Sequence, residues 1–212
     1  MVAEVSYLVG ENLGPAAETD FFRMLCSDRF RIEPVTDADL KVPLAFFDEV
    51  PFTVDYARDA VIVESPASAD ERTRDGSAVP VRLERDGPAV DAFMQLDLPG
   101  ARTVEVEIDM GSDSLILDER LAVAVGVDLH RDGVRRLEGR DETGHAYTRF
   151  FTRLAGSISA TEAPSVAQTD PEVMFQRIIY DGLVGDAFLR GFTVTYDLPR
   201  ERVVFGAADA TV

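Results

Sequence analysis

The sequence predicts an all-β protein with one or two short helices, and three observations support this fold class. Short segments alternate apolar with polar or charged residues, as half-buried strands do, at Val81–Leu83, Ala92–Leu96 and Val104–Ile108. Residues 140–152 place turn residues at Glu142–His145 between extended flanks, which predicts a hairpin. A stretch near residue 42 also recurs 142 positions later, which indicates one structural unit present twice.

Only two segments favour a helix. The longer one begins at Asp118, has an acidic first turn, and stops at Gly126, a residue suited to the position just beyond a helix. A shorter helix is expected around Ala187–Arg190. Strands separated by turns therefore account for most of the chain.

The composition divides the chain into parts. The segment Ser65–Gly87 is rich in Ser, Asp, Arg, Pro and Gly and lacks apolar periodicity until its end, which is typical of a linker. We expect a first domain at residues 1–64, a linker at 65–80, a second domain at 81–206 and a tail at 207–212. With 212 residues and 46% hydrophobic content, the chain can build a real core.

Charge and cysteine content exclude several functions. The chain carries 21 Lys and Arg against 39 Asp and Glu, a formal charge of −18, so its surface should repel nucleic acids and anionic membranes. Its single cysteine, Cys26, allows no intrachain disulfide and is interpreted as a small buried hydrophobe. We find no pattern of a signal peptide and no apolar run long enough for a membrane helix, so a cytoplasmic protein is expected.

The internal repeat aligns Val42–Val63 with Val184–Phe205 without a gap. Seven of the 22 aligned positions are identical: Val42, Ala45, Phe46, Thr53, Asp55, Arg58 and Val61 match Val184, Ala187, Phe188, Thr195, Asp197, Arg200 and Val203. We interpret each copy as a short helical turn, a strand, a tight turn and a return strand.

Asp109-Met110-Gly111-Ser112 follows an alternating strand and precedes apolar Leu115–Leu117, and Leu183-Val184-Gly185 follows later in the chain. This arrangement resembles one lobe of the retropepsin-like and pepsin-like aspartic proteases, over about residues 92–206. The resemblance implies a closed-barrel lobe in which Asp109 is catalytic and Met110, Gly111 and Ser112 complete its loop. It also implies that Leu183, Val184 and Gly185 support that loop, and that Thr143, Gly144 and His145 form a substrate-covering flap.

The chemistry of this family needs two facing carboxylates that share a proton, so that one activates a water while the other acts as the acid. The glycine allows close backbone approach, and the hydroxyl of Ser112 can hydrogen-bond the carboxylate. One lobe supplies one aspartate. The resemblance therefore implies a symmetric homodimer in which a second Asp109 completes the pair, without metal or cofactor.

The sequence departs from the family pattern at two places. Residues 1–41 contain no D-x-G, and Lys41-Val42-Pro43 stands where the second copy has its apolar-apolar-Gly tripeptide, so residues 1–64 resemble a degenerate lobe. Met110 replaces a threonine whose hydroxyl joins the two lobes in the family. Two hypotheses follow: an aspartic endopeptidase completed in trans, or an inactive pseudoprotease that binds a peptide or protein. A third is that the sequence is a fragment lacking the other motif.

The two histidines, His130 and His145, are expected in exposed turns. A metal site needs a third convergent ligand, and no recognisable spacing supplies one. We therefore expect no metal.

Overall fold

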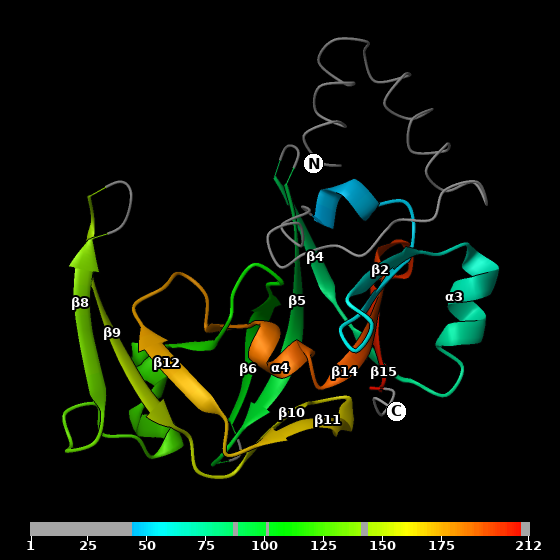
Figure 1. Cartoon of the computed structure of the whole chain (residues 1–212). Coiled ribbons are helices and arrows are strands. Elements are labelled where there is room, and N and C mark those ends of the chain that lie inside the picture. The colour runs from blue at the N-terminus through cyan, green and yellow to red at the C-terminus, as the bar shows by residue number, and fades with distance from the viewer. Residues whose placement is uncertain (1–43, 87–88, 101, 141–143, 209–212) are drawn as a thin grey trace. The chain divides into compact units, whose positions relative to one another are not determined.

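The computed structural model describes residues 44–86, 89–100, 102–140 and 144–208 (Figure 1). These residues are mostly strands with two short α-helices, which confirms the expected all-β class. They fall into two compact units. Among the described residues, the first combines 44–76 with 85–86, 89–90 and 192–208, and the second combines 77–84 with 91–100, 102–140 and 144–191.

The first unit is built on an antiparallel sheet of strand order β2-β1-β14-β15. Its strands are β1 (Phe52–Asp55), β2 (Ala60–Val63), β14 (Phe192–Asp197) and β15 (Arg202–Ala207). Three short helices accompany them: η1 (Leu44–Phe47), η4 (Leu198–Arg200) and α3 (Pro66–Arg72). Helix α3 begins with a capping box, in which the Ser65 side chain and Ser68 satisfy each other's backbone N–H groups.

The two copies of the repeat pair with each other around a local two-fold axis. In the β1–β14 ladder Thr53 lies opposite Thr195, its own counterpart 142 positions later, and their hydroxyl oxygens are 2.8 Å apart. The bounds of β2 shifted by 142 fall within β15, and Asp59 and Glu201 adopt the same left-handed conformation at φ 49°. The repeat expected from the sequence is therefore present as a pseudo-symmetric sheet.

Aromatic stacking and a buried carboxylate fill the interior of this unit. The rings of Phe47, Phe52 and Tyr196 stack in series, at centroid distances of 4.1 and 4.7 Å. Glu64 is 2% exposed, accepts a hydrogen bond from Thr53 and contacts the Arg72 guanidinium. The Thr53 hydroxyl has one proton, which it donates to Glu64. In the threonine pair, Thr195 must therefore be the donor and Thr53 the acceptor.

The second unit is built on one large sheet of strand order β11-β10-β5-β6-β13-β7-β12-β9-β8, with β4 pairing to β5. The bounds of the strands in this sheet are β4 Arg82–Asp86, β5 Ala89–Leu98, β6 Arg102–Ile108, β7 Leu115–Asp118, β8 Arg135–Arg140, β9 Ala146–Arg153, β10 Ser157–Ala160, β11 Ala163–Thr169, β12 Glu172–Gln176 and β13 Gly182–Val184. Strand β3 (Ser77–Pro80) also falls within the second unit but is not a strand of this sheet. The described residues show no pairing that closes this path. The closed barrel stays a prediction.

The helix expected after Asp118 is replaced by shorter turns, whereas the short helix expected near Ala187 is present. In place of one helix after Asp118 there are two 3-10 turns, η2 (Glu119–Leu121) and η3 (Val123–Val125). The Asp118 carboxylate accepts the backbone N–H of Arg120, and this local bond favours a tight turn over a continuous α-helix. Gly126 ends the segment at φ 77°, as expected. Helix α4 (Asp186–Leu189) is the short helix expected around Ala187–Arg190.

The segment after Ser65 contains regular secondary structure, and the β8–β9 hairpin is present. The segment 65–80, expected as a linker, contains helix α3 and strand β3, because the Ser65 capping box and the buried Ala69 and Val79 give it local order. The hairpin expected around Glu142–His145 is present as β8 and β9 in antiparallel register. Cys26, Thr143 and the degenerate first motif at 41–43 lie outside the described residues.

Candidate active-site loop and the adjoining sheet face

Asp109 lies directly after β6, at the start of a tight loop. Its backbone N–H donates to the carbonyl oxygen of Val184 at 3.0 Å. Its carboxylate Oδ1 accepts the N–H of Gly111 at 2.8 Å, and its carbonyl accepts the N–H of Ser112 at 3.2 Å. Backbone groups of the loop therefore fix both the main chain and the side chain of Asp109.

Leu183-Val184-Gly185 lies against this loop. Strand β13 runs parallel to β6 and antiparallel to β7, so it fills the gap between the two strands that flank the loop. A Cβ atom on Gly185 would lie 2.1 Å from the carbonyl oxygen of Ser112, closer than any side chain tolerates. The backbone of Asp186 then donates to that same oxygen at 2.8 Å. Only glycine fits at 185.

The other loop residues differ from the family-based expectation. The Ser112 hydroxyl exchanges hydrogen bonds with the backbone of Ser114, at 3.4 and 3.5 Å, instead of contacting the Asp109 carboxylate. The expected hydroxyl–carboxylate bond is therefore wrong, because the N–H of Gly111 takes that role. Met110 is half-buried and its thioether offers no hydrogen-bond donor.

Glu107 is a carboxylate close to Asp109 that sequence reasoning missed. It precedes Asp109 by two positions on β6, and side chains two apart on a strand share a face. Burial, followed by the negative charges of Asp109 and Asp91, raises the pKa of Glu107 to about 7. The alternation of VEVEID was the available signal, since it places Val104, Val106 and Ile108 inward and the acids opposite.

Aromatic and cationic groups pack beside Glu107. The ring of Tyr180 contacts Phe93 edge-on at 5.0 Å, and burial, with Glu107, Asp91 and Glu84, raises its pKa. Arg82 lies 4.3 Å from the centre of the Phe93 ring and binds Glu105 through two hydrogen bonds of 2.9 and 2.7 Å. Arg82 is thus paired with Glu105, and no cation within the described ranges lies within 4.0 Å of Glu107.

The β8–β9 hairpin carries the residues expected as a flap. Gly144 is exposed at φ +86°, and its carbonyl oxygen accepts a hydrogen bond of 2.7 Å from Arg140. His145 is exposed as well. The ring of Tyr147 lies over Gly139 on the facing strand, where any Cβ would approach it to 2.5 Å. Whether this hairpin covers a ligand stays a prediction.

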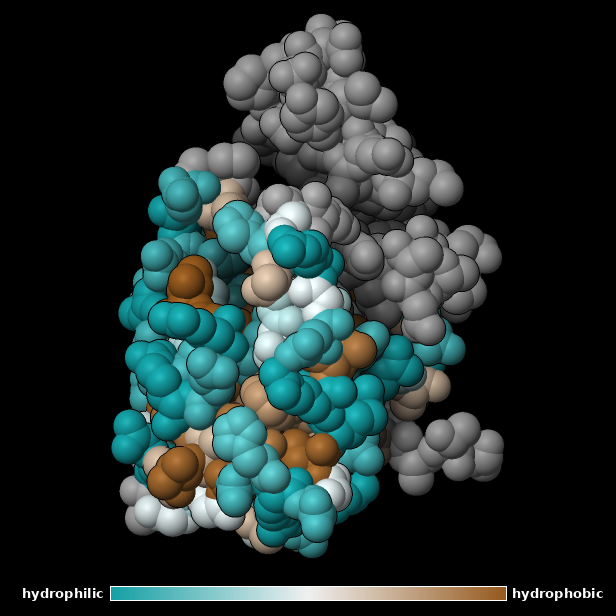
Figure 2. Space-filling view, turned by 90° about the vertical axis from the view of Figure 1, so that its left-hand side faces the viewer, coloured by the Kyte–Doolittle hydropathy of each residue, from teal (hydrophilic) through white to brown (hydrophobic). Residues whose placement is uncertain are grey.

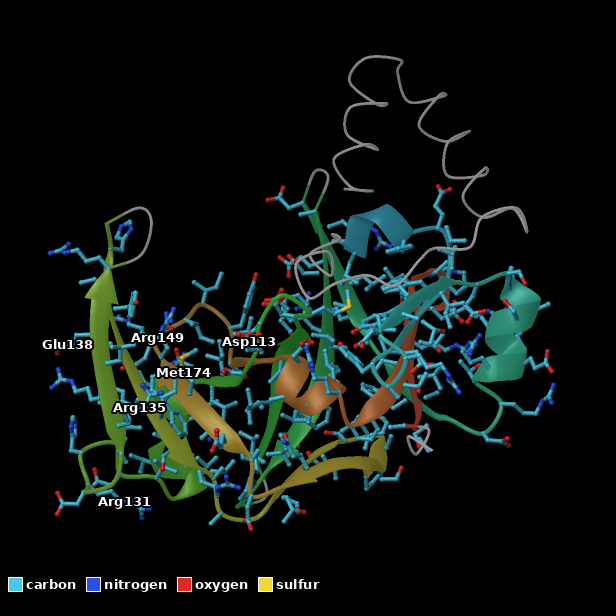
Figure 3. All side chains as sticks on the ribbon, viewed as in Figure 1. Asp113, Arg131, Arg135, Glu138, Arg149 and Met174 are labelled. Carbon is cyan, nitrogen blue, oxygen red and sulfur yellow. The ribbon has the colours of Figure 1, made fainter. Side chains whose placement is uncertain are left out.

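One face of the large sheet connects the hairpin to the aspartate loop. Successive cross-strand partners form a row on this face: Arg135 (β8), Phe151 (β9), Met174 (β12), Ile116 (β7), Leu183 (β13) and Glu107 (β6). Figure 3 labels Arg135, Arg149 and Met174 on three adjacent strands of it. The opposite face is core, since Leu115, Leu117 and Phe175 are at most 1% exposed.

We find no group of three or more His, Cys, Asp or Glu in the described ranges that could hold a metal ion. His130, expected in an exposed turn, is exposed and packs edge-on against Phe150 at 6.0 Å. Within the same ranges no helix has the length and apolar character needed to cross a membrane.

Fold and loop together define an all-β protein in which an Asp-x-Gly-Ser loop follows strand β6. No family model matches the chain. No curated protein matches its sequence either. Among solved structures, a retropepsin-like aspartic protease from Rickettsia conorii is similar, with TM-score 0.44 and 14% identity, over 61% of this chain and 91% of its own. Basic 7S globulin from soybean is similar with TM-score 0.41 and 13% identity, over 74% of this chain and 51% of its own. The chain thus spans about half the length of the soybean protein.

Proposed function

We propose that this protein binds an extended peptide along the sheet face between the β8–β9 hairpin and the aspartate loop, without cleaving it. The observation that carries the proposal is the row from Arg135 to Glu107. Phe151, Ile116 and Leu183 in this row are apolar yet only half-buried, so they keep surface for a ligand, whereas Met174 between Phe151 and Ile116 is buried. Apolar sheet surface flanked by polar groups is what peptide side chains occupy in binding proteins.

The absence of cleavage is supported by the pseudo-symmetric sheet of the first unit. Strand β14 pairs with β1 on one side and β15 on the other, so it has no free edge for a second copy. In a symmetric dimer joined through this sheet, β14 of one copy would pair with β14 of the other. In this chain β1, from the first copy of the repeat, already occupies that position beside β14. A second Asp109 supplied through this sheet is thereby disfavoured, and acid catalysis of the family type needs that second carboxylate.

Peptide-bond hydrolysis is the second candidate, and the pKa of Glu107 favours it. The Glu107 carboxyl group, whose pKa is raised to about 7, can supply a proton beside the carboxyl group of Asp109 below that pH. In this version Asp109 activates a water and Glu107 protonates the leaving amine. The aspartic endopeptidase completed by a second subunit remains the alternative form of the same chemistry.

One experiment separates binding from hydrolysis. The full chain and Asp109→Asn are incubated with unfolded casein at pH 5 to 6.5, and cleavage and retention on the immobilised protein are both measured. The binding proposal expects no fragments from either protein and equal retention. Fragments made by the wild type and absent with Asp109→Asn would overturn it and support hydrolysis. Fragments lost with Glu107→Gln as well would assign the second carboxyl to Glu107.

A further inference from the structure

The β8–β9 hairpin is basic within a strongly acidic chain. Residues 131–153 hold six arginines and four acidic residues, whereas the whole chain has a formal charge of −18. Figure 2 shows the side of the molecule that carries β8 and β9: it is largely hydrophilic, with hydrophobic residues in separate spots. A local positive region of this kind attracts anionic ligands even though the net field of the chain repels them.

Two of these arginines lie on the row face, next to each other. Leu137 is the register partner of Arg149, and Arg135 precedes Leu137 by two positions, so Arg135 and Arg149 are diagonal neighbours. The Arg135 guanidinium lies 3.8 Å from the centre of the Phe151 ring, and that of Arg149 lies 4.3 Å from the Tyr147 ring. Aromatic rings therefore hold both cations in place.

Neither arginine is neutralised by an acid. Arg149 donates to the Gln176 amide oxygen at 2.8 Å, which leaves its charge intact. Across the described ranges no carboxylate oxygen lies within 4.0 Å of Arg135 or Arg149, although acids outnumber bases almost two to one in the chain. Other arginines of this sheet are paired, such as Arg153 with Glu172. Two positioned, uncompensated guanidinium groups form a ready carboxylate receptor.

We propose that the ligand of this face is an acidic peptide, in which an Asp or Glu side chain pairs with Arg135 and Arg149 while apolar neighbours lie over Phe151 and Ile116. This inference rests on the proposed peptide-binding function and names its ligand class. From β9 to β6 there are four inter-strand steps of about 4.8 Å along the sheet, a path that about six extended residues cover. The apolar positions of the ligand therefore lie between its acidic residue and the aspartate loop.

The test is a selection of random decapeptides displayed on phage, performed on the full chain and on two variants. Arg135→Gln combined with Arg149→Gln removes both charges and keeps side-chain length. Arg102→Gln is the matched control, because Arg102 is an exposed arginine at the other end of β6 with no acid partner in the described ranges. Circular dichroism and thermal unfolding confirm that each variant is folded. Affinities of selected peptides are then measured by fluorescence anisotropy.

We expect selected peptides to be enriched in Asp and Glu beside apolar residues, and to bind the double variant at least tenfold more weakly than the wild type or Arg102→Gln. Selected peptides without acidic enrichment, or equal affinity for the double variant, overturn the acidic-ligand inference while peptide binding stands. Failure to select any peptide on the wild type overturns the proposed function itself. Tight binding of single-stranded oligothymidylate that needs both arginines overturns the inference in favour of a nucleic-acid ligand.

Discussion

Replacing Glu107 by glutamine is expected to stabilise the protein, and more so at alkaline pH. Glu107 has an ordinary pKa of 4.5 that the fold raises to about 7, chiefly by burial and secondly through Asp109. The folded state thus holds the proton more tightly than the unfolded state. The contribution of Glu107 to stability is complete below pH 4.5 and is lost as the pH rises through 7.

The size of the gain follows from the two pKa values. Each pKa unit corresponds to ~1.4 kcal/mol, so the full shift is worth ~3 kcal/mol at pH 8. At pH 5.5 the folded carboxyl is largely protonated and the same arithmetic leaves ~1.4 kcal/mol. Glutamine keeps the shape without the charge. Glu107→Gln should therefore exceed the wild type by up to ~3 kcal/mol at pH 8 and by much less at pH 5.5.

The assay is urea unfolding at pH 5.5 and 8, followed by far-UV circular dichroism because the chain has no tryptophan. Both values avoid the isoelectric point near 4.4, where solubility is lowest. Glu105→Gln is the matched control on the same face of β6. Its pKa is lowered by the hydrogen bonds from Arg82, so its stabilisation is present above pH 4.5, and its loss should destabilise slightly at both pH values. An unchanged free energy of unfolding for Glu107→Gln at pH 8 would refute the reasoning.

Three further substitutions test individual contacts described above, at Gly185, Thr53 and Asp118. Gly185→Ala should cost several kcal/mol in thermal unfolding or displace the aspartate loop, since its Cβ would lie 2.1 Å from the carbonyl oxygen of Ser112. Gly191→Ala is the control, because its Cβ would lie 3.4 Å from the nearest atom, and its effect in the same assay should be small. Thr53→Val should cost ~1–3 kcal/mol and more than Thr195→Val, because only Thr53 donates to the buried carboxylate; equal costs by urea unfolding would contradict that proton assignment. Asp118 is buried, which raises its pKa, but the bonds from Arg120 and Ile178 outweigh this and lower it, so Asp118→Asn should lose stability at pH 7 and lose less near pH 3, as thermal unfolding at the two pH values will show.

Patterns that depend on local sequence predicted much of this fold. Alternation predicted β5 and β6, and turn residues predicted the β8–β9 hairpin. The repeat at 142 positions predicted one strand–turn–strand unit in two copies, and the turns of the two copies share a left-handed conformation at Asp59 and Glu201. The helix expected after Asp118 is wrong, because the Asp118 side chain caps a 3-10 turn. The segment after Ser65, expected as a linker, contains helix α3, which begins with a capping box.

The candidate site was only partly visible in the sequence. The D-x-G-S pattern and the Leu183-Val184-Gly185 tripeptide are local signals, and in the structure β13 pairs with β6 just before Asp109. The coupling of Glu107 to Asp109 could have been inferred from strand alternation but depends on burial that only tertiary packing sets. The row from Arg135 to Glu107 crosses six strands whose order in the sheet differs from their order in the sequence. Its residues are therefore not regularly spaced along the chain, and the sequence pattern does not predict the row.

Strand β13, which lies against the aspartate loop, is synthesised long after the loop itself. Gly182 lies 73 positions after Asp109, and its parallel pairing with Val106 encloses a long loop, which makes this contact slow to form. A growing chain that ends before β13 possesses the aspartate but lacks the backbone that orients it. The loop therefore matures only when nearly all of the second unit has been synthesised, so premature termination before residue 182 should give a product without its site.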